Sequence, residues 1–361
     1  MMHLIFDTFL ENMTLLITFM FLALKVKEYL IIKIKKMNLI DWLAPLAISI
    51  LSMYVMHHPL EHEGMRVDLR GVPIFFISYL GGWKFGLLSL LLPSWYRYEL
   101  GGPTAIEGII QAIIVPAVIG SLFHKRSTFN PPYTIIYVKH MMIAFLIYQI
   151  IRSVLSLVTT HITVNTVFIL TIFEVVAILC ISLMYNDSNR NLLTKNDLEY
   201  QSRHDSLTSL YNIGHFRNRV EEFIVQGKPF YIAMFDVDYF KKYNDTHGHP
   251  AGDTVLRSIG QLLQESVRTE DIFARYGGEE FIICFTNTTD IQKAKSIAEG
   301  FRQKVENYRF FGEETQPTGR LTISIGLSGL SKNKELDELI DEADQALYKA
   351  KNTGRNKLQT T

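Results

Sequence analysis

Polarity changes abruptly along this chain of 361 residues, at about Asp187. Before that residue the sequence consists mainly of long apolar runs, and after it charged residues are frequent. A membrane-spanning helix needs about 20 predominantly apolar residues. The first half therefore predicts an all-α polytopic membrane domain, with candidate spans at residues 4–24, 39–57, 72–96, 105–123, 135–158 and 162–185. Gly81-Gly82 and Pro93 interrupt the third span, so a kinked or re-entrant segment is expected there.

The polar half alternates between helical and extended patterns. Residues 187–204 contain neither Gly nor Pro and predict a linker helix. Beyond the linker, helices are expected at 216–225, 254–266, 291–308 and 336–352, and strands at 231–236, 272–276, 281–285 and 321–327. The expected organisation is a membrane domain over 1–186, the linker helix, and an α/β domain over 205–361 in which helices cover a sheet. The formal net charge of zero gives no electrostatic preference for nucleic acid.

Two acidic turns in the second half predict a metal site. One is Asp236-Val237-Asp238, which closes the apolar, β-rich run 230–235, and the other is Gly277-Gly278-Glu279-Glu280. Each turn alone is weak evidence, because most acidic turns are solvated. Together, two strand ends can meet around Mg²⁺, which prefers carboxylate and phosphate oxygens. The two glycines have no side chains, so a nucleotide can approach this backbone closely.

The second half resembles the GGDEF family of diguanylate cyclases. The resemblance rests on six segments in the family's order: DSLTSLYN (205–212), FDVDYFKKYND (235–245), GHPAGD (248–253), RYGGEEF (275–281), SIG (324–326) and ALYKAKNTGRN (346–356). The family implies a nucleotide-cyclase-like sheet covered by helices, and condensation of two GTP into cyclic di-GMP by a homodimer. One departure is Ile213, which stands where the family usually has Arg; it removes a charge without touching the expected metal or nucleotide residues.

The resemblance assigns roles residue by residue. It implies that Mg²⁺ or Mn²⁺ is bound by Asp236, Glu279 and the backbone carbonyl of Val237, with Glu279 also the family's proposed general base. Lys241 would face the phosphates, and the substrate-binding positions are Asn244, His249, Asp253, Gly277, Gly278, Lys351 and Arg355. An amide and a carboxylate can pair with a guanine edge. The alternatives are structural: Asn and Asp often cap helices, and basic residues at a helix end favour the helix dipole.

Arg268-Thr269-Glu270-Asp271 has the RxxD form at the family's usual distance upstream of the signature. In relatives this spacing marks an inhibitory site for cyclic di-GMP, where arginine grips phosphate and guanine in a planar fork. The alternative is an ordinary surface ion pair between Arg268 and Asp271.

Part of the first half is similar to the five-transmembrane receptor region of LytS-type sensor kinases, which implies a sensory input. The similarity rests on Asp68-Leu69-Arg70 and on the turn GGPTAIEG (101–108). Arg152 and Glu174 lie inside predicted spans, where charges ordinarily pair or line a polar site. They are expected either to form an ion pair or ligand pocket, or to lie nearer the surface on tilted helices.

The lysines between 25 and 36 favour a cytoplasmic first loop, and six full spans from that start would place the second half outside. GTP is a cytoplasmic metabolite, so either one segment does not cross fully or the lysine-rich stretch is an interfacial helix. Three functions compete: a membrane-bound diguanylate cyclase under sensor control, a catalytically silent nucleotide receptor or interaction module, and a transporter with a regulatory tail.

Overall fold

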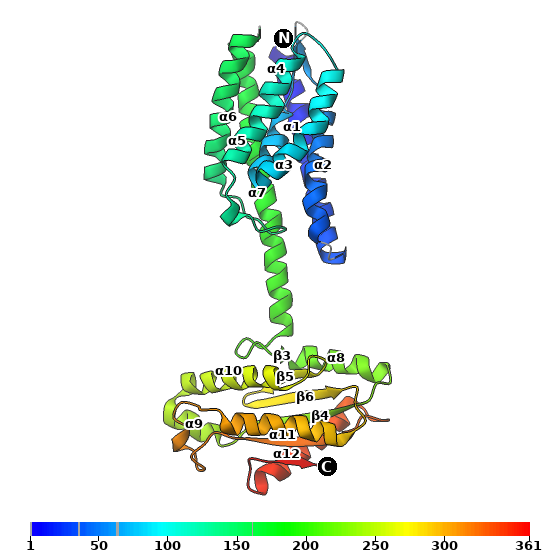
Figure 1. The fold of residues 1–361 in the computed structure, drawn as a ribbon, viewed down its shortest axis with the longest axis vertical. Coiled ribbons are helices and arrows are strands. Elements are labelled where there is room, and N and C mark those ends of the chain that lie inside the picture. Colours follow the sequence, from blue (N-terminus) through cyan, green and yellow to red (C-terminus); the bar gives the residue numbers. More distant parts are fainter. Residues whose placement is uncertain (1, 35–36, 63–64, 161) are drawn as a thin grey trace. The chain divides into compact units, whose positions relative to one another are not determined.

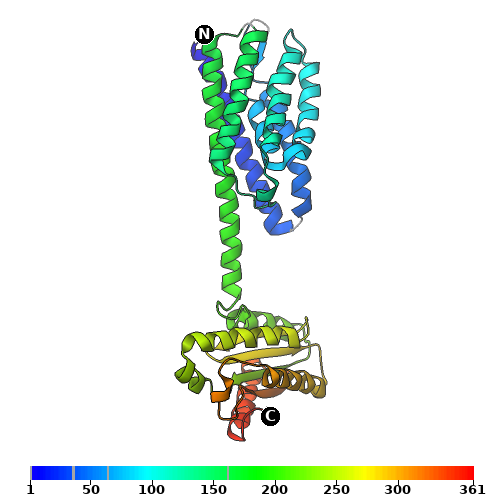
Figure 2. The ribbon, with the colours of Figure 1, turned by 60° about the vertical axis from the view of Figure 1, so that its left-hand side comes forward.

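The computed structural model describes residues 2–34, 37–62, 65–160 and 162–361, and it divides into two compact units, Met1–Lys195 and Asn196–Thr361. The first unit is helical, and the second combines a sheet with helices (Figure 1). The division falls within residues 187–204, which the sequence predicts as a linker. These residues form no separate helix, because α7 (Val164–Arg203) runs unbroken through them, as the turned view in Figure 2 also shows.

The N-terminal unit is made of apolar helices joined by short irregular segments. Four helices in the described residues are long and apolar enough to cross a membrane: Gly71–Glu99 (α3), Ala105–Leu122, α6 (Val138–Thr159) and α7. A shorter apolar helix covers Trp42–Val55. The helix Trp42–Val55 is part of α2 (Met37–Val55), and the helix Ala105–Leu122 comprises α4 (Ala105–Ile109), η2 (Ile110–Ile114) and α5 (Val115–Leu122). The remaining elements are α1 (Met2–Tyr29), η1 (Leu30–Ile34), β1 (Leu60–His62), β2 (Met65–Val67) and η3 (Arg126–Thr128).

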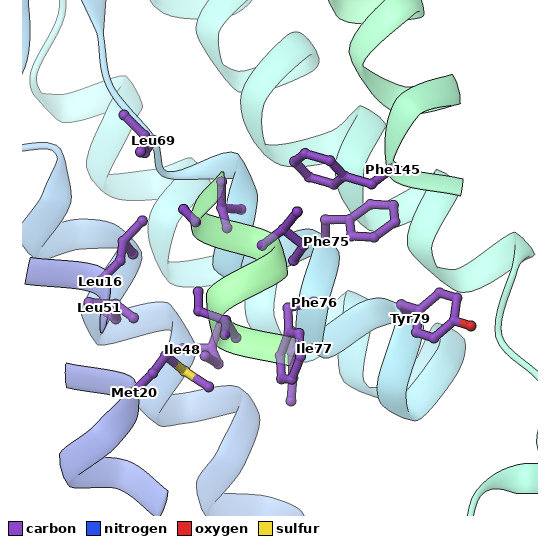
Figure 3. Close-up of a cluster of buried hydrophobic side chains, with 14 of the residues drawn as sticks. Leu16, Met20, Ile48, Leu51, Leu69, Phe75, Phe76, Ile77, Tyr79 and Phe145 are labelled. Atoms are coloured by element: carbon purple, nitrogen blue, oxygen red, sulfur yellow. The ribbon is translucent and has the colours of Figure 1, made fainter. Parts of the chain in front are cut away.

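Helix α3 forms the centre of this unit. All its residues from Gly71 to Leu80 are buried, because α1, α2, α6 and α7 contribute side chains to the same core. Figure 3 shows Phe75, Phe76 and Ile77 of α3 among side chains of these neighbours. The helix is kinked at Gly82, whose φ of 65° and ψ of −156° are not helical. The predicted interruption of the third span is therefore confirmed.

The C-terminal unit contains one six-stranded sheet in the order β3-β5-β6-β4-β7-β8. The central strand β4 is antiparallel to β6 and β7, β5 is antiparallel to β6, and the two edge strands pair in parallel. The strands are β3 (Tyr211–Asn212), β4 (Phe230–Val237), β5 (Ile272–Gly277), β6 (Glu280–Thr286), β7 (Ile323–Leu330) and β8 (Leu358–Thr360). The helices are α8 (Ile213–Val225), α9 (Phe240–His247), α10 (His249–Ser266), α11 (Ile291–Asn307), η4 (Glu313–Thr315) and α12 (Leu336–Asn352).

Helices cover both faces of this sheet, so β4 is buried along its whole length. Successive side chains of a strand point to opposite faces. Accordingly Tyr231, Ala233 and Phe235 join a core with α9, α10 and α11, while Ile232 and Met234 join a core with α8 and α12. The predicted α/β class and the all-α N-terminal class are both confirmed.

Several limits differ from the sequence prediction: α8 begins at Ile213 rather than 216, and β7 covers Ile323–Leu330 rather than 321–327. Helix α10 begins at His249 rather than 254, because Pro250 fits the first turn of a helix, where no N–H partner is needed. Helix α9 was not expected at all, since it has only eight residues and a mostly polar sequence. It is fixed by tertiary packing through its two buried aromatic residues, Phe240 and Tyr243.

Candidate functional site

The acids predicted to bind metal gather at the end of β4 and the β5–β6 hairpin. Asp236 is paired in register with Glu280 of β6 on one side and with Ser324 of β7 on the other. Glu279 lies in the hairpin turn that immediately precedes β6. The Nζ atom of Lys351, near the end of α12, lies 2.8 Å from Oδ2 of Asp236. The structure therefore brings Asp236, the hairpin acids and Lys351 together.

The electrostatics of this cluster are dominated by burial and like charge. Burial raises the pKa of Asp236 to about 6; Glu279 and Glu280 add to the rise, and Lys351 opposes it. Burial also raises the pKa of Glu280, with Asp344 and Glu279 contributing and Lys351 opposing. Carboxylates held this way are disfavoured in their charged forms unless a cation compensates them.

The residues present fit a divalent cation. Among the described residues there is no cluster of three or more His, Cys, Asp or Glu side chains arranged for a metal. The predicted donor set needs only two carboxylates, Asp236 and Glu279, because the carbonyl of Val237 and phosphate oxygens complete it. Mg²⁺ ordinarily binds through one or two carboxylates plus substrate phosphates and water. A cation here would also supply positive charge that Lys351 alone does not.

The hairpin turn is open to an approaching ligand. Gly278 has φ of 53°, a left-handed conformation that favours glycine. A Cβ atom added at Gly277 or Gly278 would meet no atom within 4 Å. Arg275 fixes the turn, since its Nε and Nη2 atoms donate to the carbonyl of Gly278 at 2.9 and 2.7 Å. Its Nη1 atom also donates to both carboxylate oxygens of Asp205 at 3.2 Å.

The residues predicted to recognise guanine lie on α9 and α10, which meet at Gly248. The Oδ1 atom of Asn244 is buried and, within the described part of the chain, accepts no hydrogen bond. Gly252 packs directly against it, and a Cβ there would lie 1.9 Å from that oxygen. Asp253 follows on α10 and is half-buried, while His249 and Lys241 are exposed. Asn244 thus offers an unused acceptor, and Asp253 on α10 offers a second one.

The two predicted terminal-phosphate residues contact different residues near the end of β4. Lys351 contacts Asp236, whereas the guanidinium of Arg355 lies 4.3 Å from the ring centroid of Tyr239. The Nη1 atom of Arg355 donates to the Tyr239 hydroxyl at 3.3 Å. Sequence reasoning gave no role to Tyr239. The feature that could have pointed to it is an aromatic residue three positions after Asp236.

Asp238 is the second residue that sequence reasoning left without a role. It is 2 % exposed, and its carboxylate accepts hydrogen bonds from Thr322 and Ser324, both at 2.7 Å. The feature that could have pointed to Asp238 is its place as the second acid of the Asp236-Val237-Asp238 turn.

Arg268 and Asp271 are paired with each other. The Nε and Nη2 atoms of Arg268 donate to the two oxygens of Asp271 at 3.0 and 2.7 Å. Asp271 is buried and also accepts from the backbone N–H of Thr286 at 3.0 Å, whereas the Arg268 side chain is 24 % exposed. The ion pair that was the alternative interpretation of this motif is therefore present. Its arginine also contacts Glu270 and the carbonyl of Thr286.

A second candidate site lies in the N-terminal unit. A cavity of about 60 Å³ is lined by Asp68, Arg70, Glu107, Gln111, Gln149 and Arg152, among others. Arg152 forms an ion pair with Glu174, as one of the sequence alternatives predicted, and Gln149 donates to Glu174 at 2.5 Å. Arg70 pairs with Asp68, yet its buried Nη1 atom has no hydrogen-bond partner among the described residues. The cavity therefore presents paired charges and an unused donor.

Comparison with known proteins agrees with this division. Residues 202–357 match the family model described as "Diguanylate cyclase, GGDEF domain", and residues 27–186 match "5TMR of 5TMR-LYT". The chain thus combines a GGDEF domain with a LytS-type five-transmembrane receptor region, as the sequence predicted. The helices and the second match together indicate a membrane protein.

Individual relatives cover the chain to different extents. The probable diguanylate cyclase DgcT of Escherichia coli is 40% identical over 157 residues, which are 43% of this chain and 34% of DgcT. This chain therefore spans about a third of that relative. The uncharacterized protein YhcK of Bacillus subtilis is 29% identical over 361 residues, covering 96% of both chains. A crystal structure of the coiled coil and GGDEF domain of DgcB from Caulobacter crescentus, in complex with c-di-GMP, has 26% identity and a TM-score of 0.44, and it covers 48% of this chain and 94% of that one.

Proposed function

We propose that the protein is a membrane-bound diguanylate cyclase that condenses two GTP into cyclic di-GMP and two diphosphates. The observation that carries the proposal is the acid cluster of Asp236, Glu279 and Glu280 at the open glycine turn, with Lys351 against it. This arrangement suits a divalent cation and a polyphosphate. Mg²⁺ or Mn²⁺, held by Asp236, Glu279 and the carbonyl of Val237, would offset phosphate charge when bound.

The reaction joins the 3′-hydroxyl of one GTP to the α-phosphate of another and releases diphosphate. Phosphoryl-type transfer depends mainly on positioning and on charge stabilisation. Asn244 and Asp253 hold the guanine edge, with His249 in the same binding set. The turn at Gly277 and Gly278 lets the nucleotide approach the backbone closely. Lys351 and Arg355 hold the terminal phosphates. Lys241 faces the phosphates, and Glu279 takes the proton of the attacking hydroxyl.

Each GGDEF domain offers one such half-site, so the working enzyme is a homodimer in which two bound GTP molecules face each other. We place the domain boundaries at 186/187 and 204/205, with residues 205–361 on the cytoplasmic side, where GTP is available. The N-terminal domain serves as the sensor. Its charged cavity at Arg70 and Arg152 supports a ligand-responsive role, and α7 gives a continuous path for the signal to the cyclase domain. Arg268 and Asp271 form the inhibitory site for cyclic di-GMP.

The test is product formation by the full chain in lipid nanodiscs, with GTP and Mg²⁺, followed by chromatography and mass spectrometry. We expect cyclic di-GMP and diphosphate in a ratio of one to two. If a dimeric preparation binds GTP but yields no product, the protein is a nucleotide receptor rather than an enzyme. For residues 187–361 alone, specific activity should rise with protein concentration, whereas constant activity of a monomer at every dilution would contradict the homodimer.

A further inference from the structure

Asp238 is a buried acid at the tip of β4 to which the proposed reaction gives no role. Its backbone N–H donates to the carbonyl of Thr322 at 2.9 Å. Its Oδ1 atom accepts from the Ser324 hydroxyl, and its Oδ2 atom accepts from the Thr322 hydroxyl, both at 2.7 Å. Oδ2 also accepts from the backbone N–H of Asn356 at 3.1 Å. A carboxylate has about four lone-pair sites, so most of its capacity is used within the protein.

The segment that Asp238 reaches is strained. Gly354, Arg355 and Asn356 have φ angles of 115°, 59° and 46° in succession. Left-handed backbone at residues with a Cβ costs free energy. Such conformations persist only where the surrounding structure holds them, and they concentrate at ligand-binding positions. The turn after α12 therefore needs external contacts to keep its shape.

Asn356 provides those contacts. Its side-chain Oδ1 atom accepts from Nη1 of Arg302 at 2.5 Å, and its Nδ2 atom donates to Glu306 at 2.8 Å. These two partners lie on α11, whereas Asp238 holds the backbone N–H from β4. The turn is thus attached both to α11 and to the strand that carries Asp236.

Arg355 lies between two elements that depend on Asp238. Its backbone belongs to the strained turn, and its N–H donates to the carbonyl of Ala350 at 3.0 Å. Its guanidinium lies over Tyr239, which directly follows Asp238 and is itself left-handed, with φ of 56°. A change at Asp238 would release the turn, and with it the position of Arg355 over Tyr239.

We propose that Asp238 is a positioning residue that fixes the strained turn at 354–356 and so aims Arg355 at the terminal phosphates of GTP. The inference rests on the proposed function, because it requires Arg355 to bind those phosphates. It assigns the two acids of the turn different tasks: Asp236 contacts Lys351 and would hold the metal, while Asp238 contacts only the protein.

The test compares equilibrium binding of GTP and GDP, with Mg²⁺ present, to the full chain in nanodiscs. Asp238→Asn keeps the shape but replaces one acceptor oxygen with a donor. We expect the preference for GTP over GDP to fall roughly tenfold, the scale of one charge-assisted hydrogen bond. Arg355→Ala should give the same loss, and the double variant should lose no more than either one, because both changes remove one interaction. Ser324→Ala, which leaves the bond between Asp238 and Asn356 in place, is the matched control and should keep the preference.

Several outcomes would overturn the proposal. Additive losses in the double variant would mean that Asp238 does not act through Arg355. A higher Mg²⁺ requirement with an unchanged GTP preference would make Asp238 a metal ligand instead. If the asparagine variant does not fold, Asp238→Glu moves the carboxylate by one methylene and should show the same loss; retention of the preference would refute the idea. Wild-type binding without turnover would end the cyclase proposal, yet the binding comparison would still decide the role of Asp238.

Discussion

Two charged sites, one in the membrane half and one at the end of β4, balance their charges in opposite ways. In the membrane half the buried acids Asp68 and Glu174 each have an arginine partner within the chain. In the C-terminal half the acids Asp236 and Glu280 share the ammonium of Lys351, and the negative charge of Glu279 lies nearby. A charge inside a bilayer must be balanced by the protein itself, because hydrocarbon supplies no counter-ion. A partly exposed acid cluster can leave that balance to a ligand. The pairing of charges therefore separates a structural or sensory site from a site prepared for a cation and phosphates.

The largest expected effect comes from the acid of the glycine turn. Glu279→Gln keeps the size of the side chain and removes its charge, so both metal binding and proton removal should be lost. We expect cyclic di-GMP formation to fall by on the order of a thousandfold, as when a principal electrostatic contact to the reacting groups is removed. The measurement is initial rate with GTP and Mg²⁺ in nanodiscs.

The matched control is Glu338→Gln, an exposed acid on α12 outside the cluster. Its rate should equal that of wild type. A Glu279→Gln protein that keeps a tenth or more of the activity would show that catalysis does not depend on this charge. The contrast between the two halves would then have no consequence for catalysis.

Much of the fold could be predicted from the sequence because its strongest signals are local. The run from Tyr231 to Asp236 is apolar and β-rich, and it is β4; the Gly277-Gly278 hairpin also forms as predicted. Helix α12 has the expected limits, because its apolar spacing agrees along the whole helix. Short elements such as α9 and β3 could not be predicted, since packing against the sheet decides them.

The site was predictable in its residue types but not in its pairings. The acids near the glycine turn could be identified from motifs, whereas the contact between Asp236 and Lys351 joins residues far apart in sequence. The same holds for Asp238 and Asn356. In the membrane half, Arg152 and Glu174 were visible as charges in apolar runs, but only the fold of α6 and α7 selects pairing over exposure.

The second prediction concerns that membrane pair. Arg152→Met leaves Glu174 buried without its cation, and breaking a buried pair on one side typically costs about 3–5 kcal/mol. The double variant Arg152→Met with Glu174→Gln should recover much of this loss, because no uncompensated charge remains. Thermal unfolding of the detergent-solubilised full chain measures both. Equal losses in the single and double variants would show that packing, not charge balance, holds α6 against α7.

Sensor control adds a second readout for the same variants. Both should change cyclase activity in nanodiscs relative to wild type, since the cavity at Arg152 would set the output through α7. An activity identical to that of a chain whose spans are replaced by an unrelated dimeric anchor, under every condition tried, would reduce the membrane half to an anchor.

The third prediction concerns Arg268. This arginine makes a bidentate contact with Asp271, is partly exposed, and is proposed to bind cyclic di-GMP. Arg268→Ala should leave the initial rate unchanged, because Asp271 keeps its bond from Thr286. Inhibition by added cyclic di-GMP should weaken by about tenfold with the loss of a forked phosphate contact. Arg219→Ala, which removes an exposed ion pair on α8, is the control. Superimposable inhibition curves for wild type and Arg268→Ala would reduce the motif to its ion pair with Asp271.

The smallest effect is expected from replacing Arg302. This arginine pairs with Glu299 and Glu306, so here acids of the C-terminal half have a partner within the chain, as in the membrane half. Hydrogen bonds from Arg302 lower the pKa of Glu299 and of Glu306. A depressed carboxyl pKa contributes stability that is present above the unfolded value of about 4.3 and is lost as pH falls through the folded value. Both acids are partly exposed, so solvent screening limits the contribution to about 0.5–1 kcal/mol. Arg302→Met should therefore lower the melting temperature of residues 187–361 by a few degrees at pH 7, and the difference should shrink as pH falls through the lowered pKa values of Glu299 and Glu306. A difference that stays constant from pH 7 to pH 3 would assign the loss to packing around Asn356 rather than to charge.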